Sequence, residues 1–107
     1  MAVRKEIRVG DEVPIQINFK EDGAVFDVSS ATVLEMWIEK PSGAPMKVIA
    51  SFLTDGTDGS IIYNFAQGEV DEEGQWKYQG HAESASWKVT SKKSEFYVDE
   101  VIDVSSL

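Results

Sequence analysis

Cysteine is absent from the sequence, and histidine occurs only once, as His81. Without cysteine the chain can form neither a disulfide nor a thiolate metal site. Catalysis by a serine or cysteine nucleophile needs a base beside it, so His81 alone would have to serve. The strand pattern places His81 on the solvated side with Lys77 and Gln79, which predicts a surface histidine. We therefore expect no enzyme, no catalytic residue and no cofactor.

Long apolar runs are also missing, and cationic residues are scarce. Residues 1–10 alternate charged and apolar side chains, unlike a signal peptide, and no stretch is long enough to span a membrane. Ten Lys and Arg against nineteen Asp and Glu give a net charge of -9, which repels phosphate backbones and anionic lipids. We expect a soluble protein, made in the cytoplasm, that binds neither nucleic acid nor membrane.

Carboxylates are the only abundant metal ligands, and they gather in two turns. One turn contains Asp55 and Asp58, and the other spans residues 71–73. Neither follows the alternate-residue spacing of a calcium-binding loop. The preference of Asp and Gly for turns accounts for both segments, so we predict no metal site.

What the sequence does contain is alternation of apolar and polar residues with a period of two, which is typical of strands. Turn residues separate the extended segments at intervals of roughly 8 to 12 residues, the spacing of a sandwich or small barrel. We predict one all-β domain over residues 1–107: an antiparallel β-sandwich of seven to eight strands with little or no helix. Its core covers about residues 9–104, and residues 1–8 form an arm or edge strand. The expected extended segments are residues 13–19, 25–28, 32–40, 46–53, 60–65, 75–82, 87–89 and 95–104.

The three tryptophans differ in their phase relative to the apolar positions. Trp37 lies out of phase with the apolar residues of segment 32–40, which predicts that its side chain points outward. Trp76 lies in phase with Tyr78, so we expect it in the core. The neighbours of Trp87 do not fix its direction. The predicted contact surface consists of Trp37, Glu35, Glu39 and Trp87.

Short motifs occur along the chain in a recognisable order. They are Val9-Gly10-Asp11, Asp22-Gly23 followed by residues 26–33, Lys40-Pro41-Ser42-Gly43, residues 58–63, Gly74-Gln75-Trp76-Lys77-Tyr78-Gln79 and Ser94-Glu95-Phe96-Tyr97-Val98. In this layout, residues 9–104 resemble the small immunoglobulin-like β-sandwich domains of tailed-phage virions, in particular the N-terminal domain of baseplate upper proteins. The resemblance implies an immunoglobulin-like sandwich that links or decorates rings of the capsid, tail or baseplate.

Baseplate upper proteins continue into linker and receptor-binding-protein contact regions that these 107 residues lack. We therefore expect a free-standing virion component or an excised domain. Its predicted function is that of a non-catalytic structural or assembly domain in the head, tail or baseplate of a tailed-phage or prophage virion. Its expected partners are other virion proteins and, in a homo-oligomer, further copies of the chain.

Unpaired strand edges can accept a strand from a neighbouring copy. The charged segment at residues 4–9 is a candidate for such a strand, swapped or added across a ring. A competing hypothesis is a carbohydrate-binding or adhesive sandwich whose platform is Trp37 with Trp87. A small enzyme, the third alternative, would need two facing carboxylates in a cleft.

Overall fold

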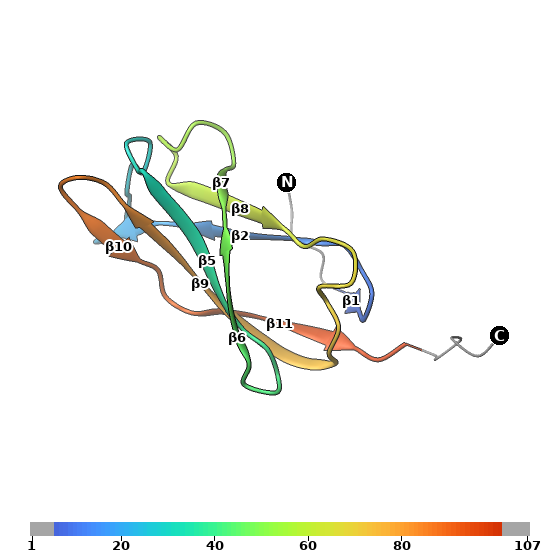
Figure 1. Cartoon of the computed structure of the whole chain (residues 1–107). Coiled ribbons are helices and arrows are strands. Elements are labelled where there is room, and N and C mark those ends of the chain that lie inside the picture. Colours follow the sequence, from blue (N-terminus) through green and yellow to red (C-terminus); the bar gives the residue numbers. More distant parts are fainter. Residues whose placement is uncertain (1–5, 102–107) are drawn as a thin grey trace.

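The computed structural model describes residues 6–101, and these form strands and turns with no helix among them (Figure 1). The described part of the chain accordingly contains no helix long and apolar enough to cross a membrane. The all-β prediction is confirmed for these residues, and its physical basis is the period-two alternation that suits pleated strands.

Two main sheets account for most of the strands. Sheet A has the order β1 (Ile7–Arg8), β11 (Ser94–Asp99), β9 (Gly74–Glu83), β5 (Val33–Glu39) and β6 (Pro45–Ile49), and β10 (Lys88–Thr90) also pairs with β9. Sheet B has the order β2 (Pro14–Asn18), β8 (Ser60–Asn64) and β7 (Ser51–Phe52). A separate hairpin joins β3 (Lys20–Glu21) to β4 (Ala24–Val25). Among the described strands, every pair is antiparallel except β1 with β11.

Sheets A and B share one apolar core. The ring of Phe65, which follows β8, meets the ring of Trp76 on β9 edge to face, with centroids 5.8 Å apart. Trp76 is fully buried, which confirms its predicted place in the core. Gly80 is needed where β9 crosses β2, because a Cβ there would lie 2.8 Å from Ile17 Cγ2. This packing is consistent with a β-sandwich. The buried apolar residues include Ile15, Ile17, Phe19, Met36, Ile38, Ile61, Trp76, Tyr78, Ala82 and Val98.

The hairpin between β3 and β4 shows how local sequence dictates a turn. Asp22 and Gly23 both have positive φ, 51° and 79°. A two-residue loop with left-handed backbone at both positions matches the right-handed twist of the flanking strands, and Asp-Gly is a preferred pair for it. The Asp22-Gly23 pair therefore closes the hairpin between β3 and β4.

Three expected strands differ from the observed ones. Of residues 25–28, only Val25 lies in a strand, β4, and the chain then leaves the hairpin. Residues 46–53 do not form one strand, because the chain leaves sheet A after β6, and β7 pairs with β8 in sheet B. The last strand was expected to reach residue 104, but β11 ends at Asp99, and Glu100 and Val101 are exposed and outside any strand. Residues 102–104 lie outside the described part. In all, the described chain has eleven strand segments, four of them only two residues long.

The N-terminal segment has a defined place from residue 6 onward. Strand β1 pairs in parallel with β11 of the same chain, with Ile7 opposite Val98. Ile7 is 1% exposed and belongs to the core, so burial of its side chain holds this short edge strand in position. Residues 4 and 5 of the candidate exchange strand lie outside the described residues.

Candidate functional site

The face of sheet A that points away from sheet B, here called the outer face, carries polar side chains and one tryptophan. Its residues alternate with the core residues of β5 and β9, so the period of two assigns them to this face. In the middle of the face, Trp37 on β5 lies opposite Gln79 on β9 and Lys47 on β6. The outward prediction for Trp37 is therefore correct, and the side chain is partly buried by its neighbours.

Trp37 is held by two contacts that fix its ring. Its indole Nε1 donates a hydrogen bond to Glu35 Oε1 at 3.0 Å. One face of the indole stacks on the imidazole of His81, with centroids 4.4 Å apart and an angle of 17° between the planes. An aromatic ring fixed in this way presents contact area at little cost in side-chain entropy.

The prediction that His81 is a solvated histidine is wrong, although its strand phase is correct. His81 lies on the outer face opposite Glu35, yet only 8% of it is exposed. The indole of Trp37 covers it from a diagonal position on the neighbouring strand, a contact that aromatic side chains can make across a sheet. Both ring nitrogens also have partners: Nδ1 is 2.8 Å from Thr90 Oγ1, and Nε2 is 2.7 Å from Glu83 Oε2.

The contact with His81 changes the acidity of Glu83. The hydrogen bond from His81 lowers the pKa of the Glu83 carboxyl below its ordinary value, and the charge of Lys88 lowers it further. Glu83 and Thr90 therefore hold the imidazole of His81 in place, and the imidazole in turn stacks on the indole of Trp37. The two hydrogen bonds and the stacking contact together hold the Trp37 ring in place on the outer face.

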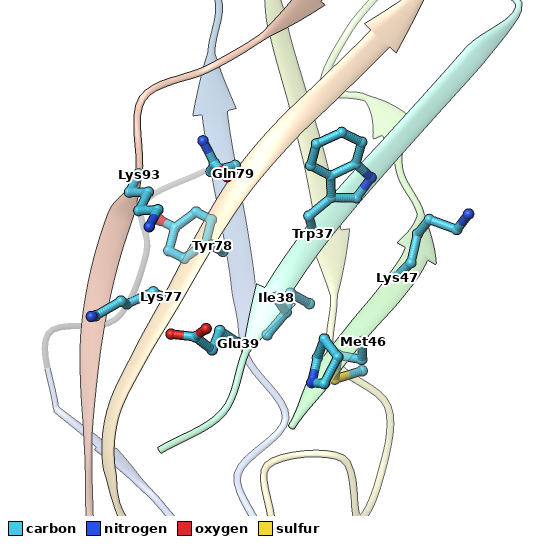
Figure 2. Close-up of a pocket in the computed structure, with 10 residues that line it drawn as sticks. Trp37, Ile38, Glu39, Met46, Lys47, Lys77, Tyr78, Gln79 and Lys93 are labelled. Atoms are coloured by element: carbon cyan, nitrogen blue, oxygen red, sulfur yellow. The ribbon is translucent and has the colours of Figure 1, made fainter. Parts of the chain in front are cut away.

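A hollow with a volume of about 460 Å³ opens beside Trp37 on the outer face (Figure 2). This volume falls within the roughly 300–1,000 Å³ found for ligand pockets. Figure 2 shows three lysines from three different segments around it: Lys47 on β6, Lys77 on β9 and Lys93 in the bend before β11. Among the lining residues only Glu39 is acidic. The lining of the hollow therefore contains more cationic than acidic side chains, although the net charge of the chain is -9.

Most acidic clusters elsewhere have structural roles in turns. Asp55 Oδ1 accepts hydrogen bonds from both the backbone N and the Oγ1 of Thr57, which lowers the pKa of Asp55. Asp71 forms an ion pair with Lys40 at 3.0 Å, which ties the segment before β9 to the β5–β6 hairpin. Within residues 6–101, no group of three His, Asp or Glu side chains is arranged to hold a metal ion.

Three of the four predicted contact residues lie together, and the fourth does not. Glu35, Trp37 and Glu39 follow one another on the outer face of β5. Trp87 is partly buried against the core and packs edge to face on Phe26, with centroids 5.1 Å apart. Its strand neighbour Lys88 pairs with the outer-face residue Glu83, so alternation directs Trp87 to the inner side. A platform of Trp37 with Trp87 is therefore not assembled.

Sequence reasoning missed the lysines of the hollow and an exposed isoleucine at the sheet edge. Ile49 on β6 is 85% exposed, more than any other large apolar residue in the described chain. Its phase opposes that of Met46, Val48 and Ala50, which was a usable signal that it points outward. The gathering of Lys47, Lys77 and Lys93 required knowledge of which strands pair.

No family model matches the chain, and no curated protein is significantly similar to it.

Proposed function

We propose that the chain is a non-catalytic structural or assembly domain of a tailed-phage or prophage virion and that it acts through protein–protein contacts. In this proposal the fold is an immunoglobulin-like sandwich of seven to eight principal strands. The order of sequence motifs supports the virion assignment, and the all-β architecture is compatible with it. The domain would be made in the host cytoplasm and carried in the head, tail or baseplate.

One observation favours protein contact as the mode of action: a rigid aromatic and an exposed aliphatic residue share the outer face of sheet A. Trp37 is fixed by Glu35 and His81, and Ile49 is 85% exposed two residues from Lys47 on the adjacent strand. A fixed aromatic next to apolar area, surrounded by charged groups, is the usual composition of a protein contact surface. The charged surroundings here are Glu39, Lys47 and Lys77.

Mass spectrometry of purified particles tests this proposal. Tailed-phage particles produced from the genome that encodes the chain should contain its peptides at a fixed ratio to the major structural proteins. The Trp37→Ala variant of the protein should be absent from particles or present in a smaller amount. The control substitution Lys20→Ala, at another exposed residue, should leave the amount unchanged. Absence of the protein from wild-type particles would overturn the structural role.

A carbohydrate-binding or adhesive module is the second candidate, and the hollow beside Trp37 favours it specifically. The indole forms part of the wall, and the side chains of Gln79 and Glu39 could hydrogen-bond to hydroxyl groups of a sugar stacked there. Quenching or enhancement of tryptophan fluorescence on a glycan panel, abolished by Trp37→Ala, would support this function. The absence of any response across the panel would remove it.

A further inference from the structure

Strand β6 forms one end of sheet A and has a free edge. In the described chain it pairs on one side with β5, and no strand pairs with its other side. Two backbone hydrogen bonds at the ends of the β5–β6 ladder show which main-chain groups of β6 face β5. Lys40 N donates to Ala44 O, and Ala50 N donates to Leu34 O. Hydrogen-bonded and non-hydrogen-bonded pairs alternate in an antiparallel ladder. The main-chain groups of Met46 and Val48 therefore point to β5.

The alternate residues of β6 direct their main-chain groups to the free edge. These are the N–H and C=O of Lys47, the N–H and C=O of Ile49, and the C=O of Pro45, since proline has no N–H. The side chains of the same three residues lie on the outer face, where Ile49 is 85% exposed and the Lys47 side chain is 68% exposed. The edge therefore presents hydrogen-bonding groups, an apolar side chain and a cation together.

A second copy of the chain is a poor match for this edge. An antiparallel pair centred on Lys47 would place Lys47 opposite the same residue of the second copy, and like charges directly opposite are destabilising. A pair centred on Val48 would place Lys47 opposite the uncharged Ile49 and Pro45 opposite Ser51, and a pair centred on Ile49 would place Lys47 opposite Ser51. Ser51 already pairs with Ile62 on β8.

An acidic segment matches the edge better than a neutral or basic one. The hollow beside β6 is lined by Lys47, Lys77 and Lys93 and by one acidic residue, Glu39. Lys47 also lies 3.8 Å from Glu35, but this contact leaves most of its side chain exposed toward the edge. A carboxylate on an added strand would lie directly beside Lys47, in a row that continues to Trp37.

We propose that β6 accepts an extended acidic segment of a partner protein as an added antiparallel strand. Main-chain hydrogen bonds to Lys47, Ile49 and Pro45 supply affinity, and the side chains that alternate on the outer face supply specificity. The partner carries an acidic residue beside Lys47 and an apolar residue beside Ile49, two positions away along its strand. This inference rests on the proposed function, since it names the kind of partner that the contact surface takes.

A peptide titration followed by NMR tests the proposal on the complete chain. The probe is acetyl-TVTETVT-amide, whose symmetry presents a valine, a glutamate and a valine on one face in either strand direction. We expect it to shift the amide signals of Lys47 and Ile49 and to slow their hydrogen exchange. The control peptide, with lysine in place of glutamate, should bind about tenfold more weakly, because it replaces a cross-strand attraction by a repulsion.

Charge-reversed variants complete the test. Lys47→Glu should reverse the preference between the two peptides, so that the lysine peptide binds better than the glutamate peptide. Lys20→Glu, an exposed lysine on β3 with the same change in net charge, should keep the wild-type preference. Equal binding of both peptides by the wild type, or no response at Lys47 and Ile49, would overturn the proposal.

Two other results would also overturn it. Concentration-dependent protection of the Lys47 and Ile49 amides without any peptide would identify a second copy as the occupant of the edge. A response to glycans that maps to Trp37 while β6 remains unchanged would favour the carbohydrate module. Particle mass spectrometry distinguishes failure of the β6 proposal from failure of the proposed virion function. If the protein is found in virions, its structural role stands whatever occupies β6.

Discussion

Trp76 and Trp37 lie on neighbouring strands of sheet A, and their side chains leave the sheet on opposite faces. Trp76 is completely buried, donates from Nε1 to the carbonyl oxygen of Glu72, and stacks on Phe96 with centroids 5.6 Å apart. Trp37 also donates a hydrogen bond and also stacks on a ring, but it remains partly exposed. Similar local contacts therefore have different consequences: burial makes Trp76 a source of stability, and exposure leaves Trp37 available for contact.

The largest effect is expected when each tryptophan is truncated in turn. Trp76→Ala should lower the free energy of unfolding by about 3 to 5 kcal/mol, because it removes apolar contacts and leaves a cavity between the sheets. Trp37→Ala should cost about 1 kcal/mol, since mainly the stacking with His81 is lost. Urea unfolding followed by circular dichroism measures both. If Trp76→Ala does not fold, Trp76→Phe provides the comparison, and equal costs for the two positions would contradict the assignment of roles.

A smaller effect is expected from the support beneath Trp37. The pKa of Glu83 is lowered in the folded state by the hydrogen bond from His81, so the unfolded state binds more protons as the pH falls. The stabilisation is present above the unfolded pKa, for which the reference value is 4.5, and is lost as the pH falls through the folded pKa. Urea midpoints measured from pH 7 to pH 3 should therefore fall less steeply for Glu83→Gln than for the wild type. Parallel curves would show that this contact contributes nothing to acid stability.

The period of two made the strands and most of their faces predictable from the sequence. It is a local property of the extended backbone, so the burial of Trp76 and the outward direction of Trp37 follow from their neighbours alone. The Asp22–Gly23 turn was predictable for the same reason, because its positive φ values suit these residue types.

The parts that could not be predicted depend on pairing between distant segments. The burial of His81 requires that β5 and β9 pair in the register that sets Trp37 diagonally across from it. The change of sheet after β6 depends on β8, which lies further along the sequence. The inner position of Trp87 follows from the pairing of β10 with β9. Alternation gives the face of a residue within its own strand, but it gives no information about which strand lies beside it.

Residue-resolved hydrogen exchange of the isolated protein tests the central claim most directly, since that claim requires the edge of β6 to be free. The amides of Met46 and Val48 should be protected by their bonds to β5, whereas those of Lys47 and Ile49 should exchange rapidly in the same strand. An alternating pattern of slow and fast exchange along β6 is the predicted result. Slow exchange at Lys47 and Ile49, equal to that at Val48, would show that the edge is already covered and would contradict the account.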